Sequence, residues 1–230
     1  TKLTVEARRE WQRRAGEHLL LREGSYGLTE THTMDTLPGG FQDDDFDLRI
    51  EPVFEGVPFP GTEVRITDFE TGELLPLGET GEIALRTPSL MTGYWRRPDA
   101  TAEAIRDGWF HTGDVGRIDE DGFLHFLGRR KEMLKVNGMS VFPSELEVLL
   151  GRHPQVVACG VVGVPDEARG EVPVAFVTVS RDDDGLDEQA LTRWCEEQMA
   201  TYKVPRIRVL DELPTTDTGK ISKIALSELA

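Results

Sequence analysis

The sequence has few cysteines, no long apolar run and a deficit of positive charge, and each absence excludes a class of protein. Cys159 and Cys195 are the only two cysteines, too few for a disulfide framework or a cysteine-ligated metal site. No apolar run approaches the roughly 20 residues that span a bilayer, and no signal-peptide pattern opens the chain. We therefore expect a protein of the reducing cytoplasm without a transmembrane segment.

Acidic residues outnumber basic ones by 42 to 26, so the formal net charge is −16 at pH 7. A general nucleic-acid binder needs basic patches that release counterions from phosphates, so we expect no nucleic-acid partner. A nucleotide substrate is not excluded, because local charge decides how a phosphate is bound. The basic residues gather in two places: 129–131 with Lys135, and Lys220 with Lys223.

The chain changes character near residue 130, which predicts two domains, 1–129 and 130–230, with a hinge at 129–131. In the first, short strand-like runs are separated by glycine-containing turns, as in a β-rich region. The stretch 36–60 is rich in Gly, Pro and Asp and is expected to be mostly irregular. Strands are expected at 63–67, 82–86, 115–118 and 123–127, and helices at 2–18 and 98–105, with a buried strand at 19–21.

In the second domain, β-branched runs alternate with helical patterns. This alternation predicts a compact α+β module of about 100 residues, a size that can hold its own core. The fold class expected for the whole chain is therefore α+β. Strands are expected at 156–162, 172–179 and 207–210, and helices at 143–150, 186–199 and 221–229.

A polar loop at 25–31 contains four residues suited to holding a nucleotide. Gly27 allows close backbone approach, and Tyr26 has a flat face on which a base can stack. Thr29 has a hydroxyl, and Glu30 has a hard oxygen ligand suited to Mg²⁺. Taken alone, the loop is more typical of an ordinary polar turn.

Two later segments contain further candidates. Asp114 follows a glycine-bearing turn, where a carboxylate can accept hydrogen bonds from both hydroxyls of a ribose, although a turn or capping aspartate is an equal alternative. Arg129 is one of four cations that precede Gly138 in an extended stretch, and its guanidinium can fork onto a ribose or phosphate. The alternative there is a solvated basic turn between domains.

A Thr-Gly-Lys sequence ends at Lys220 and invites comparison with the Walker A phosphate loop. That interpretation fails, because Pro214 stands where the first glycine belongs and Ile221 stands where Ser or Thr would bind Mg²⁺. Lys220 would therefore act as a lone cation delivered by a loop.

The segments that contain these candidate residues, taken in their order along the chain, resemble those of the ANL superfamily of adenylate-forming enzymes. This superfamily comprises acyl- and aryl-CoA synthetases, peptide-synthetase adenylation domains and beetle luciferases. The resemblance covers nearly the whole chain, and the runs 22–26, 31–33 and 131–133 are most similar to those of fatty acyl-CoA synthetases. The matching segments are 26–30, 81–83, 91–95, 108–114, 128–138, 143–147 and 218–220.

In this superfamily, ATP and a carboxylic acid give an acyl-AMP and pyrophosphate, and a thiol such as CoA then accepts the acyl group. The resemblance implies that Glu30 helps to hold Mg²⁺ and that Lys220 is the catalytic lysine bridging the carboxylate and the α-phosphate. Tyr26 would stack on adenine, Thr29 would touch the α-phosphate, and the ribose would lie against Asp114 and Arg129. The implied nucleotide-binding set is Tyr26, Gly27, Thr29, Asp114, Arg129 and Lys220.

The resemblance also implies residues for the second half-reaction. Lys131 occupies the position of the hinge residue, which rotates as the C-terminal lid domain changes orientation. Gly138 would leave room for the pantetheine arm of CoA, and Lys135 would assist in that second conformation.

One departure from the superfamily is the absence of its Ser/Thr/Gly-rich phosphate loop, which lies upstream in members more than twice this length. We therefore expect a C-terminal fragment, with the N-terminal part of the parent enzyme missing and little ligase activity on its own. The alternatives are an adenylation domain of a peptide synthetase, an aryl-CoA ligase, a luciferase-like oxygenase, or a non-catalytic nucleotide- or partner-binding module.

Overall fold

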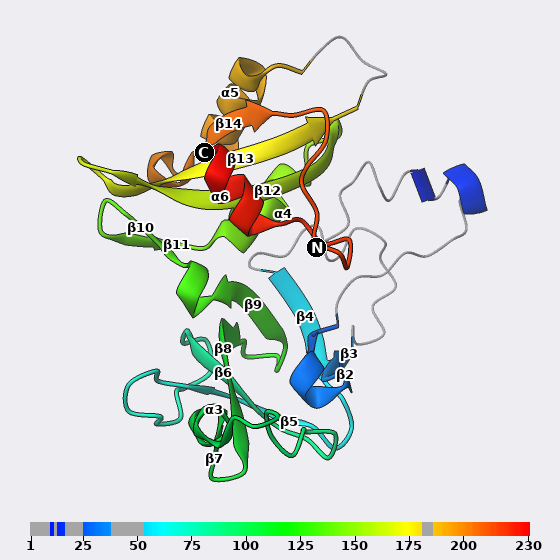
Figure 1. Cartoon of the computed structure of the whole chain (residues 1–230), viewed down its shortest axis with the longest axis vertical. Helices are drawn as coiled ribbons and strands as arrows, with labels where there is room; N and C mark the ends of the chain where they lie inside the picture. The colour runs from blue at the N-terminus through cyan, green and yellow to red at the C-terminus, as the bar shows by residue number, and fades with distance from the viewer. Residues whose placement is uncertain (1–9, 12, 17–24, 38–52, 181–185) are drawn as a thin grey trace. The chain divides into compact units, whose positions relative to one another are not determined.

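The computed structural model describes residues 10–11, 13–16, 25–37, 53–180 and 186–230. The chain divides into two compact units, one of Arg22–Lys131 and one of Thr1–Leu21 with Glu132–Ala230. We call Arg22–Lys131 the N-terminal unit and Glu132–Ala230 the C-terminal unit (Figure 1). Residues 10–11 and 13–15 are helical, as predicted, but Gly16 is not, because its φ of 103° is incompatible with a right-handed helix. The other residues of the predicted helix 2–18 and the predicted strand at 19–21 lie outside the described residues.

The N-terminal unit contains a seven-stranded antiparallel sheet in the order β3-β4-β9-β8-β6-β5, with β7 pairing β8. The turns between strands contain glycines at positive φ, such as Gly72 and Gly122, a backbone region that costs glycine little. The sheet strands are β3 Thr36–Leu37, β4 Val53–Pro58, β5 Glu63–Thr67, β6 Gly81–Arg86, β7 Ile105–Arg106, β8 Trp109–Ile118 and β9 Leu124–Arg129.

Smaller elements complete this unit. The two-stranded sheet β1-β2 contains Gly27–Leu28 and Thr33–Met34, and the 3₁₀ helix η1 (Thr29–Thr31) connects them. The helix α3 (Pro98–Ala104) begins with proline, which the first turn of a helix tolerates. The buried apolar cluster consists of Tyr26, Ile66, Ile83, Leu85 and Leu124.

Two predictions for this unit were wrong. Residues 53–58 form β4 rather than an irregular segment, because pairing with β9 supplies hydrogen bonds that a local Gly and Pro count cannot reveal. β8 begins at Trp109 rather than at Val115, so Asp114 lies within a strand and not after a turn.

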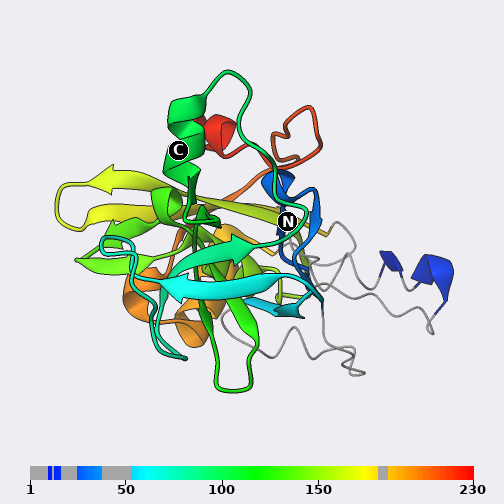
Figure 2. The same ribbon diagram turned by 90° about the horizontal axis from the view of Figure 1, so that it is seen from below.

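The C-terminal unit is built on the long antiparallel hairpin of β12 and β13, drawn in yellow-green shades (Figure 1, Figure 2). β14 joins β13 in parallel, and the short β10-β11 hairpin pairs with the start of β13. The strands are β10 Leu134–Val136, β11 Met139–Val141, β12 Val156–Asp166, β13 Gly170–Val179 and β14 Arg206–Val209. The helices are η2 Arg130–Glu132 (at the boundary), α4 Pro143–Leu150, α5 Glu188–Gln198, η3 Thr201–Lys203 and α6 Lys223–Leu229.

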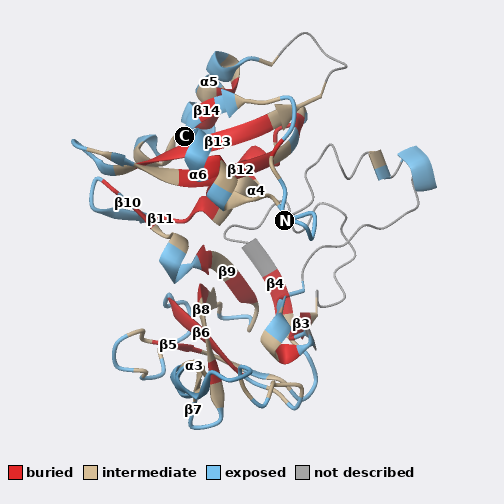
Figure 3. Ribbon diagram, in the orientation of Figure 1, coloured by how far each residue is buried: buried red, intermediate tan, exposed pale blue. Residues whose placement is uncertain are grey.

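Buried residues follow the central strands of each sheet (Figure 3). In the C-terminal unit, one cluster includes Leu146, Val161 and Leu191, and a second includes Phe176 and Leu226. The alternation of strands and helices confirms the predicted α+β class.

Candidate active site

Tyr26 lies inside the N-terminal unit rather than presenting a face to solvent. Its side chain is 6% exposed, its ring centroid is 6.0 Å from that of Phe126, and its hydroxyl donates to Asp114 Oδ2 at 2.6 Å. Its backbone N–H donates to Thr36 Oγ1 at 2.8 Å. Burial, assisted by the negative charge of Asp114, raises the pKa of Tyr26 well above its usual value, so the hydroxyl remains a donor to the carboxylate. Base stacking by Tyr26 stays a prediction.

Asp114 also faces Arg129. The two residues are paired across β8 and β9, and Arg129 Nε lies 3.2 Å from Asp114 Oδ1. The carboxylate is buried at 2% side-chain exposure, whereas the guanidinium is about half exposed at 46%. The Tyr26 hydroxyl and the Arg129 guanidinium thus hold the buried Asp114 carboxylate in one orientation. Arg129 itself also reaches solvent. The structure therefore brings three predicted nucleotide residues together.

A β-bulge sets the position of Asp114. Glu82 pairs with Val115 and Ala84 pairs with His111, so one residue of β6 faces three residues of β8. An irregularity of this kind re-aims the side chains next to it. Gly113 has φ 70°, within the region that favours glycine.

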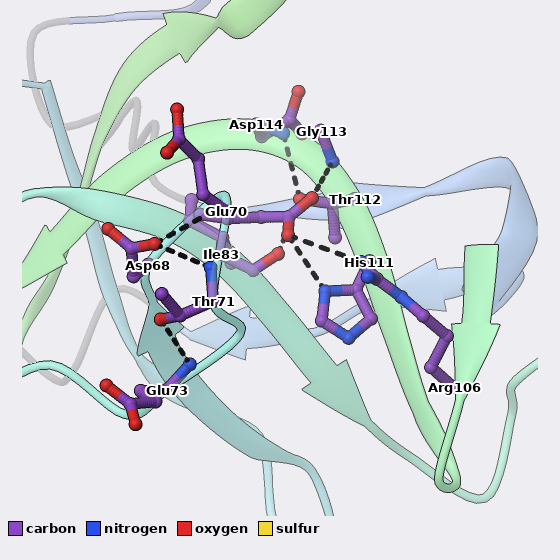
Figure 4. A network of polar contacts seen from close by, with 11 residues as sticks. Asp68, Glu70, Thr71, Glu73, Ile83, Arg106, His111, Thr112, Gly113 and Asp114 are labelled. Carbon is purple, nitrogen blue, oxygen red and sulfur yellow. Dashed lines mark hydrogen bonds and ion pairs between the residues drawn. The ribbon is translucent and has the colours of Figure 1, made fainter. Parts of the chain in front are cut away.

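Glu82 holds this bulge, and the sequence offered no signal for that role beyond its place in a matching segment. Its buried carboxylate accepts from Gly113 N at 3.1 Å and lies 2.8 Å from His111 Nδ1. Thr112 Oγ1 donates to Ile83 O at 2.7 Å and accepts from the backbone N–H of Asp114 at 3.0 Å (Figure 4). The bulge is therefore fixed by side chains as well as by the sheet.

Thr29 and Glu30 lie in η1, and Tyr94 connects this turn to a second matching segment. The Tyr94 hydroxyl donates to Glu30 Oε1 at 2.9 Å, and Met91 N donates to Glu30 O at 2.7 Å. Partial burial, together with the Glu30 carboxylate, raises the pKa of Tyr94, and the charge of Arg129 opposes that rise. Arg129 is thus close enough to influence the same side chain that positions Glu30.

Glu30 is the residue predicted to help hold Mg²⁺, and its surroundings fit that role, which stays a prediction. Mg²⁺ in nucleotide sites is held by one or two carboxylates together with substrate phosphates and water. Glu30 is partly exposed, and Tyr94 orients one of its oxygens. Among the described residues there is no group of three or more His, Cys, Asp or Glu that could hold a metal by themselves.

Lys135 and Gly138 belong to the β10-β11 hairpin of the C-terminal unit. Lys135 Nζ donates to Ser140 Oγ at 2.8 Å. Asn137 and Gly138 form its two-residue turn with φ 52° and 79°, the positive values that a type I′ turn requires. A Cβ placed on Gly138 would meet no atom of the described residues within 4 Å. Glycine is thus required by the turn, and the adjacent space is open.

Lys220 is exposed at the end of a closed turn in the same unit. Thr216 N donates to Lys220 O at 2.7 Å, Gly219 N donates to Thr216 O at 2.8 Å, and Thr215 pairs with Ile221. The backbone of the lysine is therefore fixed by the turn, while its side chain is in solvent.

The helix that follows Lys220 packs directly on a strand. A Cβ on Gly160 of β12 would lie 2.6 Å from Leu226 Cδ1 and 2.9 Å from Ile221 Cγ2. Leu226 is fully buried. This close approach holds Ile221, next to Lys220, and Leu226, within α6, against the same strand.

Lys223, which the sequence analysis only grouped with Lys220, has two carboxylate partners. Its Nζ lies 3.1 Å from Glu132 Oε2 and 3.0 Å from Glu147 Oε1. Burial acts to lower the pKa of Lys223, but the charges of Glu147 and Glu132 outweigh it and raise that pKa. No sequence signal could have found these partners, because Glu132 and Lys223 are 91 positions apart.

Two further findings concern the cysteines and the helices. Cys159 and Cys195 are both buried free thiols, and burial raises the pKa of each, for Cys195 to about 12. In the part of the chain that the structure describes, no helix is long and apolar enough to cross a membrane.

Comparison with known proteins extends these observations. The family profile for AMP-binding enzymes matches residues 1–95, and the profile for the AMP-binding enzyme C-terminal domain matches residues 145–220. The chain is 39% identical over 221 residues to a long-chain-fatty-acid–CoA ligase of Escherichia coli O157:H7, covering 96% of this chain and 37% of that protein. It is 43% identical over 199 residues to a feruloyl-CoA synthase of Amycolatopsis sp, covering 86% and 39%.

A solved structure agrees with these relatives. O-succinylbenzoate coenzyme A synthetase from Bacillus subtilis, in complex with ATP and magnesium ion, superposes with a TM-score of 0.75 at 32% identity. The superposition covers 89% of this chain and 41% of that one. The chain thus spans less than half the length of each protein compared.

Proposed function

Because this chain belongs to the ANL superfamily of adenylate-forming, AMP-binding enzymes, we propose that the complete gene product is an ATP-dependent acid–thiol ligase. It joins a carboxylic acid to CoA through an acyl-AMP intermediate and releases pyrophosphate and AMP. The single observation that supports this most directly is the buried Asp114 carboxylate held between the Tyr26 hydroxyl and the Arg129 guanidinium. A carboxylate fixed in this way is a preorganised acceptor for the hydroxyls of a ribose.

The nucleotide is held by residues of the N-terminal unit. Asp114 accepts from the ribose, and Arg129, which is half exposed, donates to the same sugar or to a phosphate oxygen. Thr29 donates to the α-phosphate. Glu30, oriented by Tyr94, is the carboxylate for the Mg²⁺ ion, which neutralises phosphate charge when bound with ATP.

Lys220 provides the charge that the transition state requires. When the acyl carboxylate attacks the α-phosphorus, negative charge grows on the phosphorus oxygens, and a fixed cation stabilises it. The closed turn 215–221 holds the backbone of Lys220 while its side chain extends into solvent. A fixed backbone with an extended side chain is the arrangement expected of a lysine that a separate domain brings to the active site.

The two domains and the hinge between them have separate roles in the reaction. Residues 1–129 belong to the large adenylate-forming domain, 130–230 form its C-terminal lid, and 129–131 form the hinge, with rotation at Lys131. The division between Lys131 and Glu132 supports the place of the hinge. Gly138 and Lys135, on one hairpin, then serve the transfer of the acyl group to CoA.

We propose a fatty acid as the carboxylic acid, on the strength of 39% identity to a long-chain-fatty-acid–CoA ligase. An aryl acid is the second candidate, favoured by 43% identity to a feruloyl-CoA synthase. Both reactions use the same ATP and CoA chemistry and differ only in the acid.

The test is an assay of the complete gene product with ATP, Mg²⁺ and CoA against fatty acids of graded chain length, ferulate and amino acids. Acyl-CoA and AMP are the expected products, measured by mass spectrometry, and Lys220→Ala should lower their formation by about 10²- to 10³-fold. Aminoacyl-AMP without transfer to CoA would identify a peptide-synthetase adenylation domain instead. AMP binding without turnover of any acid would identify a non-catalytic module.

A further inference from the structure

The residue before the hinge position is anchored within the N-terminal unit. The guanidinium carbon of Arg130 lies 4.4 Å from the ring centroid of Phe69, a cation–π arrangement in which the ring face attracts the charge. Phe69 lies in the connection after β5, next to Asp68. Backbone donors, that of Thr71 first, lower the pKa of Asp68, and the charge of Arg130 contributes to the same shift.

The residue after the hinge position is anchored within the C-terminal unit. Glu132 Oε2 accepts from Lys223 Nζ at 3.1 Å, and the same ammonium group lies 3.0 Å from Glu147 Oε1. Glu147 also accepts from the backbone N–H of Val161 at 2.9 Å, which connects it to β12. The ammonium is 33% exposed and the two carboxylates are 37% and 24% exposed, so water screens this network only in part.

Lys131 lies between these two anchors and is itself exposed. Its two neighbours are held by different units, Arg130 by Phe69 and Glu132 by Lys223. A change in backbone angles at 130 or 132 would break one of these contacts, whereas a change at 131 breaks neither. Hinges confine large φ/ψ changes to a few residues. Here the contacts on either side indicate that this residue is Lys131.

We propose that Lys223 and Phe69 are positioning residues that clamp the two sides of the hinge, so that rotation is confined to Lys131. This inference rests on the proposed ligase function, because it assumes a lid that changes orientation between half-reactions. Lys223 is also the first residue of α6, three positions after Lys220. Its bond to Glu132 therefore connects the segment that contains Lys220 to the residue next to the hinge. A rotation at Lys131 then moves Glu132, Lys223 and the Lys220 segment together as one rigid group.

Limited trypsin digestion tests the clamps without any reference to activity. Trypsin cleaves after Arg130 and Lys131, and cleavage in a native protein follows the population of the locally open form. In the complete gene product, Lys223→Met and Phe69→Ala should each speed cleavage at this segment by roughly fivefold to tenfold. Lys223→Arg should restore the rate, because arginine keeps a charge that can meet both carboxylates.

The C-terminal unit offers a matched control in Lys203. Its Nζ lies 2.7 Å from Glu145 Oε2, with side chains 27% and 22% exposed, so this ion pair resembles that of Lys223 in length and burial. Glu145 Oε1 accepts from Phe142 N at the start of α4, away from residue 132 in sequence. Lys203→Met should leave hinge cleavage within about twofold of the unsubstituted protein.

Kinetics of the separate half-reactions provide the second measurement. Lys223→Met should lower kcat of acyl-AMP formation by roughly 10- to 100-fold, since small misplacements of a catalytic group have effects of that size. KM for ATP should change less than about threefold, because the ribose contacts lie in the other unit. Lys203→Met should leave kcat near the original value.

The outcomes separate this inference from the proposed function. If the unsubstituted protein forms no acyl-AMP, the ligase proposal fails, while cleavage at 130–131 still reports on the clamps. If it is active and Lys223→Met leaves both cleavage and kcat unchanged, the clamp is wrong. If Lys203→Met has effects equal to those of Lys223→Met, or Lys223→Arg gives no recovery, the effect is one of general stability and the clamp is also wrong.

Discussion

Asp114 and Arg129 face each other across strands β8 and β9, with Arg129 Nε 3.2 Å from Asp114 Oδ1. The Asp114 side chain is buried and the Arg129 side chain is half exposed, so the pair fixes the direction of an enclosed carboxylate beside a cation that reaches solvent. The bulge at 112–114, held by Glu82, determines which part of β8 presents this carboxylate.

The Asp114→Asn substitution should weaken nucleotide binding. The amide keeps the size of the carboxylate and can still accept from Tyr26, but it loses the charge that strengthens hydrogen bonds to ribose. KM for ATP should rise by about 10- to 100-fold, since hydrogen bonds to charged groups contribute about 1.5–3 kcal/mol. Asp119→Asn is the control, because Asp119 pairs with His125 at 2.6 Å in the same unit. Equal changes in KM for the two variants would contradict a ribose role for Asp114.

The Tyr26→Phe substitution should change how stability depends on alkaline pH. The folded-state pKa of Tyr26 is raised, so the stability that its neutral hydroxyl provides is fully present below about pH 10, the usual tyrosine pKa. That stability is lost as pH rises through the folded-state pKa. The variant should lose about 1–3 kcal/mol at pH 7, because Asp114 Oδ2 loses a donor, and its stability should fall less steeply above pH 10.

Urea denaturation of the complete gene product from pH 7 to pH 11 measures both effects. Tyr202→Phe, in η3 of the other unit, controls for the loss of one tyrosine hydroxyl. An identical alkaline slope in the unsubstituted protein and in Tyr26→Phe would show that Tyr26 does not contribute to this pH dependence.

The Lys220→Ala substitution should separate the two half-reactions. Acyl-AMP formation should fall by about 10²- to 10³-fold, the effect of removing one group that stabilises transition-state charge. Thioester formation from supplied acyl-AMP and CoA should change little, because the adenylate bond is already made. Pyrophosphate exchange and single-turnover thioester assays measure the two steps, and equal losses in both would contradict the assignment.

The Gly138→Leu substitution should slow thioester formation and leave acyl-AMP formation largely unchanged. Its effect must be separated from the strain that it introduces into the turn. Any L side chain at φ 79° costs about 1–2 kcal/mol, which lowers stability whatever happens to CoA. Gly122→Leu is the matched control, because Gly122 also lies in a turn at positive φ, with open space around its Cβ position among the described residues. The two variants should lose similar stability, and only Gly138→Leu should slow thioester formation.

The sequence predicted those elements whose signals are local. The helix Pro143–Leu150 and the strand Glu63–Thr67 have the predicted bounds, since a proline at the first helical turn and a β-branched alternating run are complete within each segment. The place of Asp114 in a bulged strand could not be predicted, because it depends on how β8 pairs with the distant strand β6, where Val115 faces Glu82.

The environment of Tyr26 shows the same limit for the candidate site. Its residue type predicted a flat surface for a base, whereas its hydroxyl contacts a residue 88 positions away and its ring joins a buried cluster. Lys223 was visible only as a charge near Lys220, because its partners Glu132 and Glu147 come from distant elements. Residue types could be assigned to roles by resemblance, but the contacts that orient them arise only on folding.

The close approach of Gly160 to Ile221 and Leu226 has a consequence for interpreting natural variation. An alanine at Gly160 would place a Cβ less than 3 Å from both side chains, so Ile221 and Leu226, which flank the start of the helix after Lys220, would have to repack. We expect a genetic variant at this inconspicuous glycine to slow acyl-AMP formation more than the thiol-transfer step. Sequence surveys that weigh only charged or polar positions would misclassify it as neutral.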